Sequence, residues 1–172
     1  MTGVVAANPE IKVYISAGSN IDPVRHLRDG CHRLEQEVGP LELSAVYRTA
    51  AVGFEGDAFL NLVFAYTTSD PVEAVVATLA AVESAAGRLR GSERFSSRTL
   101  DFDLLMYGDR VVDRPGLKLP RDGILKYAFV LAPLANLAPD LVHPVACVTM
   151  RELWAAFDPA GQAVTRLDEP LG

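Results

Sequence analysis

The segment FLNLVFAYTT, Phe59–Thr68, decides the fold, because its aromatic and β-branched residues are typical of a long β-strand. The preceding stretch Leu41–Tyr47 alternates apolar and polar side chains, so we expect a further strand that pairs with it. Asp70-Pro71 follows and caps a predicted helix over 72–87, which is rich in Ala, Val and Glu. The middle of the chain is therefore predicted as strand, strand, helix.

Further elements flank this unit on both sides. Ile11–Ser16 alternates as a strand, and a helix is predicted over 23–38 with Asp22 as its cap. That helix is expected to have one apolar face, made by Val24, Leu27, Cys31 and Leu34. Leu100–Tyr107 is the fourth predicted strand. The order strand–helix–strand–strand–helix–strand is the split pattern of ferredoxin-like folds, so the predicted class is α+β, with an antiparallel sheet covered by helices.

The C-terminal part is expected to add shorter elements. Residues 110–119 are predicted as short strands and Phe129–Leu137 as an apolar helix. A last helix is predicted over 149–157, where Thr149 and Glu152 form a capping box, and the tail from Asp158 is predicted to be irregular. We expect a single domain over residues 1–172, with a core at about 11–157.

Composition excludes several classes of function. The formal net charge of −6 argues against duplex nucleic acid as the main partner, and an RNA-binding module also lacks its paired aromatic strand signature. The first nine residues do not form a signal peptide, and no apolar run approaches the ~18–20 residues of a membrane span, so a soluble cytoplasmic protein is expected. Cys31 and Cys147 are predicted to be free thiols, and His26, His32 and His143 show no metal-ligand spacing.

Asp101 and Asp103 are the first candidates for chemistry. Residues i and i+2 of a strand point to the same face, so the two carboxylates are expected to lie side by side. A hard cation such as Mg²⁺ takes oxygen ligands and is commonly held by one or two carboxylates together with substrate phosphates. Two surface aspartates paired with neighbouring arginines are the alternative, which the apolar residues around them make weaker.

An arginine-rich segment directly precedes this pair and consists of Arg88, Arg90, Arg94 and Arg98 with interleaved Gly and Ser. Arginine forks suit phosphate oxygens, and cations beside metal ligands are recurring equipment of phosphoryl transfer. A solvated charged loop is the alternative for the segment taken alone. The glycine-rich loops of known nucleotide-binding motifs are absent, so an ATP site would have to be built from the arginines and the aspartates.

Two aromatic residues and an amide form a third candidate set. Phe59 and Phe129 are able to sandwich a flat heterocycle, although each aromatic taken alone is more typical of a core. Asn61 is more informative, because an amide inside a hydrophobic strand needs a hydrogen-bond partner and is able to pair with a heterocycle's edge.

Taken together, these residues resemble the 6-hydroxymethyl-7,8-dihydropterin pyrophosphokinase family of folate biosynthesis over about residues 11–157. The most specific match is Arg98-Thr99-Leu100-Asp101-Phe102-Asp103. The remaining matches are Tyr14 to Asn20, Tyr47-Arg48-Thr49, Phe59-Leu60-Asn61, Glu83 to Arg90, and Phe129 to Leu134 with Ala138-Pro139. The resemblance implies a monomeric ferredoxin-like α-β-α sandwich that transfers pyrophosphate from ATP to the hydroxymethyl pterin and releases AMP.

The resemblance also implies roles for individual residues. Asp101 and Asp103 would bind two Mg²⁺ ions that bridge ATP, and Arg88 and Arg98 would join them as the catalytic set. The implied pterin pocket consists of Thr49, Phe59, Asn61 and Phe129. The implied nucleotide-binding set consists of Glu83, Arg90, Arg94, Phe95, Leu104, Arg121 and Lys126.

The segment 116–127 departs from the family pattern. Arg121 stands where the family usually has His, Tyr127 stands where it usually has Arg, and Gly116 and Lys118 replace side chains that often touch the nucleotide. Arg121 and Lys126 are candidates for replacement cations. A relative that binds a pterin or a nucleotide without this transfer is the alternative function.

Overall fold

The computed structural model describes residues 8–50, 57–87, 99–168 and 171. The strands are β1 (Ile11–Ser19), β2 (Glu42–Leu43), β3 (Tyr47–Thr49), β4 (Phe59–Thr68), β5 (Asp101–Tyr107), β6 (Val112–Arg114), β7 (Leu117–Leu119) and β8 (Val164–Arg166). The helices are α1 (Pro23–Val38), α2 (Val72–Ala85), α3 (Gly123–Lys126), α4 (Ala128–Leu137) and α5 (Met150–Ala156).

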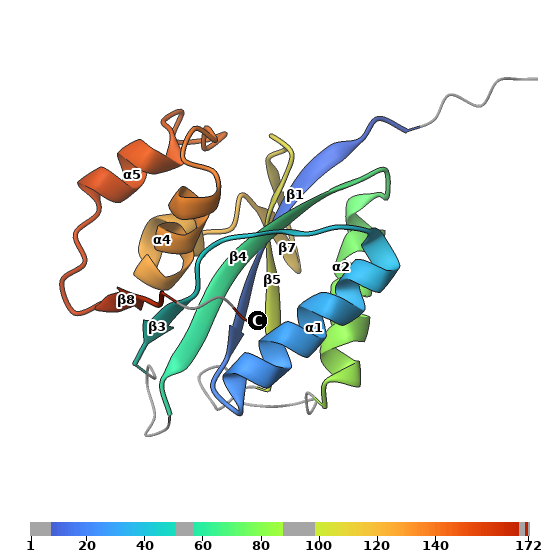
Figure 1. Ribbon diagram of the computed structural model, residues 1–172. Helices are drawn as coiled ribbons and strands as arrows, with labels where there is room; N and C mark the ends of the chain where they lie inside the picture. Colours follow the sequence, from blue (N-terminus) through green and yellow to red (C-terminus); the bar gives the residue numbers. More distant parts are fainter. Residues whose placement is uncertain (1–7, 51–56, 88–98, 169–170, 172) are drawn as a thin grey trace, which may run out of the picture.

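Within the described ranges, the strands form one antiparallel six-stranded sheet in the order β5-β1-β4-β3-β8, in which β2 also pairs with β4. Strands β6 and β7 form a separate hairpin. Helices α1 and α2 cover one face of the sheet, and α4 covers the other with α5 packed against it (Figure 1). The predicted α+β, ferredoxin-like class is confirmed.

Two hydrophobic clusters, one on each face, hold these layers together. Alternate residues of β1 and β4, such as Ile15 and Phe64, pack under α1 and α2. The intervening residues, such as Tyr14 and Val63, pack under α4. Because the sheet is covered on both faces, its middle strands carry almost continuous apolar sequence, which explains the pattern in Phe59–Thr68.

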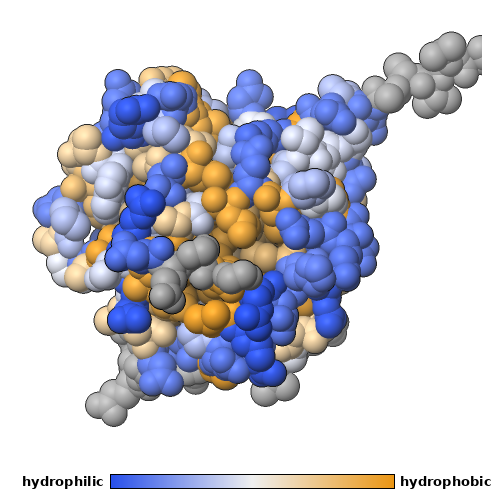
Figure 2. All heavy atoms as spheres, in the orientation of Figure 1, coloured by the Kyte–Doolittle hydropathy of each residue, from blue (hydrophilic) through white to orange (hydrophobic). Residues whose placement is uncertain are grey.

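The molecular surface agrees with this layering. Figure 2 shows hydrophilic residues over much of one face, with hydrophobic residues gathered toward its middle. None of the helices in the described segments is long and apolar enough to cross a membrane.

Most predicted elements are confirmed, including β4, α1, the two short strands of 110–119 and the capping box at Thr149 and Glu152. The continuous strand predicted over Leu41–Tyr47 is wrong. The strand is split because the Ser44 hydroxyl accepts the Val63 N–H at 2.9 Å, so a side chain replaces the backbone acceptor there.

Three smaller predictions are also corrected. Val24 is 47% exposed and does not belong to the buried face of α1. Asp22 is the residue before α1, but its backbone is left-handed and its carboxylate pairs with Arg25 at 2.7 Å, so it does not cap the helix. The tail is not irregular throughout, because β8 pairs with β3. The sheet therefore extends to Arg166, beyond the predicted core.

Candidate functional site

The two predicted metal ligands lie on the α4 face of β5. Phe102 and Leu104 point into the cluster under α1 and α2, so the alternation of the strand turns Asp101 and Asp103 to the opposite face. Asp103 is exposed and Asp101 is partly exposed, whereas Phe102 between them is buried under α1 and α2. The expected same-face carboxylate pair is present at an accessible position.

A row of three residues runs across the sheet from this pair. Asp101 lies opposite Gly18 of β1, and Gly18 lies opposite Asn61 of β4. Asn61 is buried, and its Nδ2 donates to the Thr49 hydroxyl at 3.0 Å. A Cβ atom at Gly18 would lie 3.1 Å from Asn61 Oδ1 and 3.8 Å from Phe59 Cδ1, so the glycine leaves the space between the carboxylates and the amide open.

A buried carboxylate anchors β5 from the other face. β5 is an edge strand, and the N–H of Phe102 points away from β1 toward helix α2. Oε1 of Glu83 accepts this N–H at 2.5 Å, and the Glu83 residue is only 8% exposed. Glu83 therefore fixes the backbone between the two aspartates, a role that the sequence did not reveal because the two residues lie 19 positions apart.

Arg121 lies beside the carboxylate pair. Its Nη2 is 3.5 Å from Oδ1 of Asp103. Its Nε donates to the Leu104 carbonyl at 3.3 Å, and its backbone N–H donates to the Leu105 carbonyl at 2.9 Å. The backbone after β7 is thus tied to β5, and the guanidinium is held next to Asp103. Of the two candidate cations of segment 116–127, Arg121 is the one that forms an ion pair with Asp103.

The neighbouring lysines face a different carboxylate. Lys118 pairs with Asp122 at 3.0 Å, and Lys126 pairs with the same residue at 4.0 Å. The hydrogen bond from Lys118 holds the pKa of Asp122 below its ordinary value and raises the pKa of Lys118. In this structure the ion pair of Lys126 is therefore with Asp122.

The aromatic part of the predicted pterin set includes an unpredicted neighbour. The ring of Phe129, at the start of α4, stacks on Tyr127 with a centroid distance of 5.1 Å and an interplanar angle of 20°. Gln162 binds the backbone on both sides of Tyr127, donating to the Lys126 carbonyl at 3.1 Å and accepting the Ala128 N–H at 3.0 Å. Gln162 lies in the tail that was predicted to be irregular, so no sequence pattern pointed to it.

The remaining predicted nucleotide and catalytic residues divide into two groups. The side chain of Leu104 is buried in the cluster under α1 and α2, which leaves only its backbone for a ligand. The others lie outside the described residues: Arg88, Arg90, Arg94, Phe95 and Arg98.

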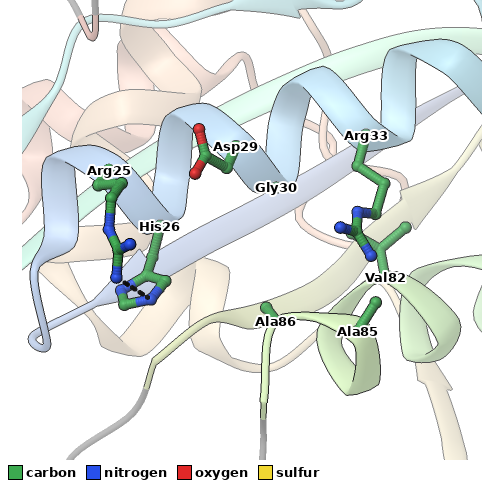
Figure 3. A pocket seen from close by; sticks show the side chains of 8 residues that line it. All are labelled: Arg25, His26, Asp29, Gly30, Arg33, Val82, Ala85 and Ala86. Carbon is green, nitrogen blue, oxygen red and sulfur yellow. Dashed lines mark hydrogen bonds between the residues drawn. The ribbon is translucent and has the colours of Figure 1, made fainter.

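A hollow of about 200 Å³ lies on the opposite face of the sheet, between α1 and α2. Figure 3 shows the side chains of Arg25, His26 and Arg33 extending from α1 toward α2. Arg25 is engaged within the protein, because its Nε pairs with Asp22 and its Nη2 lies 3.4 Å from His26 Nε2. This hollow is separated from Asp101 and Asp103 by the sheet, so it is not part of the carboxylate site.

The fold and the site define a class of protein. A ferredoxin-like α+β domain presents two carboxylates of β5 on the α4 face of its sheet, next to an arginine, and a buried amide lies two strands away on β4. Paired carboxylate oxygens are the donors that hard cations prefer, and a buried amide is a recognition group for small molecules, so the arrangement is typical of an enzyme domain.

Comparison with known proteins then identifies the family. The family model for 7,8-dihydro-6-hydroxymethylpterin-pyrophosphokinase (HPPK) matches residues 14–139, and the chain belongs to this family. The 2-amino-4-hydroxy-6-hydroxymethyldihydropteridine pyrophosphokinase of Methylorubrum extorquens is 36% identical over 154 residues, which are 87% of this chain and 96% of the relative. The enzyme of the same name from Aquifex aeolicus is 33% identical over 137 residues, which are 77% of this chain and 84% of the relative.

Solved structures agree on the fold. The wild-type Plasmodium falciparum HPPK-DHPS, crystallised with pterin and p-hydroxybenzoate, matches 87% of this chain with a TM-score of 0.68 and 15% identity. The match spans 43% of that chain, so this chain corresponds to less than half of the larger protein. At this identity the likeness supports the fold alone.

Proposed function

We propose that this chain transfers pyrophosphate from ATP to 6-hydroxymethyl-7,8-dihydropterin in folate biosynthesis, giving the pterin diphosphate and AMP. The observation that carries the proposal is the row of Asp101, Gly18 and Asn61 across the α4 face of the sheet. It supplies carboxylates for a metal–phosphate complex and an amide for a heterocycle. Membership of the HPPK family, and relatives named as this pyrophosphokinase, support the same reaction.

The donor set at the carboxylate end fits Mg²⁺. Asp101 and Asp103 offer oxygen ligands from one face of one strand, and Glu83 fixes the backbone between them. We propose that the two aspartates hold two ions together with the phosphates of ATP. When bound, the metal supplies neutralisation of the charge that develops on the transferred group. The contribution of the protein is to hold the two carboxylates in position before the substrates bind.

The pterin end is proposed to consist of Thr49, Phe59, Asn61 and Phe129. Because Asn61 donates one amide hydrogen to Thr49, its carbonyl is oriented toward Gly18. Neighbouring strands lie about 4.8 Å apart, so Asp101 and Asn61, two strands apart, are separated by ~10 Å across the bare glycine. That span accommodates a flat bicyclic ring whose hydroxymethyl group points toward the carboxylates.

The reaction follows from this placement. The hydroxymethyl oxygen forms a bond to the β-phosphorus of ATP, the bond from that phosphorus to the oxygen bridging it to the α-phosphorus breaks, and AMP leaves with that oxygen. The hydroxyl proton passes to solvent or to a phosphate oxygen. Arg121 is proposed to contact the phosphates, and the same role is proposed for Lys126 and for Arg88, Arg90, Arg94 and Arg98. Positioning and charge neutralisation, rather than a dedicated base, are the contributions of the protein.

A coupled assay tests the proposal. Incubation with Mg²⁺, ATP and hydroxymethyldihydropterin is expected to release AMP in a one-to-one ratio with pterin diphosphate. A double variant, Asp101→Asn with Asp103→Asn, keeps the side-chain shape and is expected to lose the activity. AMP release that is equal in this variant and in the unmodified chain would overturn the assignment of the site. We also propose that the chain acts as a single-domain monomer, which light scattering would check.

A further inference from the structure

Arg121 is held beside Asp103 by more than its charge. Its backbone N–H and its Nε are both bound to carbonyls of β5, at 2.9 Å and 3.3 Å, and these two bonds direct the guanidinium toward Asp103 Oδ1. The Arg121 side chain is about one-third exposed, so water only partly screens the pair. The ion pair is therefore held in position by hydrogen bonds of Arg121 to β5, unlike an ion pair between two freely rotating surface side chains.

The ion pairs around it form two sets, although the charge of Arg121 also helps to lower the pKa of Asp122, after the larger effect of Lys118. Lys118 and Lys126 are paired with Asp122, within one short segment. Arg121 alone, among the cations of the described segments, has an ion pair that reaches the carboxylate pair. The guanidinium of Arg121 thus places one positive charge beside Asp103, where a divalent metal ion would place two further positive charges.

We propose that Arg121 is a stand-in cation that neutralises Asp103 before the metal arrives and transfers to a nucleotide phosphate when the metal–nucleotide complex binds. The proposal rests on the proposed function for the identity of that complex. A guanidinium and a divalent ion that both lie against Asp103 repel each other and compete for its negative charge. A polyphosphate removes the conflict, because it offers the guanidinium a bidentate partner of higher charge.

This exchange predicts effects of opposite sign on the two ligands. Without a nucleotide, Arg121 competes with the metal for Asp103, so its removal is expected to tighten metal binding. With a nucleotide, Arg121 contributes a phosphate contact, so its removal is expected to weaken nucleotide binding. A residue that only maintained the local structure would weaken both, and one that only bound phosphate would leave metal binding unchanged. Arg121 thereby favours entry of metal and nucleotide as one complex over entry of the metal alone.

The experiment compares Arg121→Gln with Lys118→Gln. Both changes remove one positive charge from the same segment, but Lys118 pairs with Asp122 and not with Asp103. Binding of Mn²⁺ alone is measured by electron paramagnetic resonance, and binding of a non-hydrolysable ATP analogue with Mg²⁺ is measured by calorimetry. Arg121→Gln is expected to tighten Mn²⁺ binding about two- to fivefold relative to Lys118→Gln and to weaken analogue binding about tenfold.

Unchanged or weaker Mn²⁺ binding in Arg121→Gln, relative to Lys118→Gln, would overturn the proposal. Arg121→Lys keeps the charge without the planar fork and is expected to retain weak Mn²⁺ binding, which provides a second reading if the glutamine variant does not fold. The Mn²⁺ measurement uses no pterin and no turnover. A chain that binds Mn²⁺ as expected but forms no pterin diphosphate would therefore refute the proposed function and leave the cation exchange intact.

Discussion

Truncation of the Glu83 side chain is expected to destabilise the protein through loss of its hydrogen bond to the Phe102 N–H. The carboxylate accepts the Phe102 N–H, which points away from β1 at the edge of the sheet that the described strands form. Both residues are buried, with exposed fractions of 8% for Glu83 and 6% for Phe102. Glu83→Ala removes the acceptor, and the Phe102 N–H is then buried without its partner.

The size of the effect follows from that orphaned donor. Leaving a buried donor unsatisfied costs about 1–3 kcal/mol, and this donor belongs to a residue that is only 6% exposed, so we expect a loss of about 2–3 kcal/mol. For a domain of this size this corresponds to a decrease in Tm of about 4–12 °C. Glu83→Gln keeps an amide oxygen as acceptor for the Phe102 N–H, so a smaller loss of about 1 kcal/mol is expected.

Urea unfolding followed by circular dichroism measures these differences. Glu73→Ala is the matched control, because Glu73 lies on the same helix but its ion pair with Arg114 is exposed and contributes little. Glu83→Ala should also weaken Mn²⁺ binding, since the backbone between Asp101 and Asp103 loses its anchor. If Glu83→Ala unfolds at the same urea concentration as Glu73→Ala, the anchoring role of Glu83 is wrong.

Three further outcomes are expected. Gly18→Ala would place a methyl group 3.1 Å from Asn61 Oδ1 and is expected to cost about 1 kcal/mol of pterin binding, measured by calorimetry, with little change in Tm. Gly30→Ala gains about 1 kcal/mol of helix propensity, but its Cβ would lie 2.6 Å from the fully buried Leu100, so urea unfolding should show a net loss of about 1 kcal/mol rather than a gain. Burial lowers the pKa of His143, so as the pH falls below ~6.5 the unfolded chain takes up a proton before the folded chain does. The free energy of unfolding is therefore highest above that pH and decreases as the pH is lowered toward the pKa of the folded state. His143→Asn is expected to make Tm, measured as a function of pH, decrease less steeply over this range.

The parts of the fold that were predictable carry a strong local pattern. Phe59–Thr68 and Pro23–Val38 were predicted with their observed bounds, because a strand buried on both faces and an amphipathic helix each leave a clear sequence signal. Strand β8 was not predicted, since three residues with mixed polarity form a strand only when β3 offers an edge. Its existence depends on tertiary pairing and not on its own composition.

The same distinction applies to the site. The side-by-side placement of Asp101 and Asp103 follows from the two-residue period of a strand and was predicted. The contacts that define their surroundings join residues far apart in sequence, such as Glu83 with Phe102 and Arg121 with Asp103. No local pattern encodes these pairings. Gln162 was not predicted for the same reason, because no sequence feature indicates that its amide binds the backbone on both sides of Tyr127.

The pairing of β8 with β3 has a consequence for how the chain tolerates shortening. A chain cut after the last helix, near residue 157, would keep α5 but lose β8 and Gln162 together. The outer edge of β3 would then present unpaired backbone N–H and C=O groups to solvent, and these groups could pair with a strand of another molecule. The same cut would remove the Gln162 hydrogen bonds that hold the backbone beside Phe129. Solubility and ligand recognition would thus fail together, although every predicted site residue would still be present.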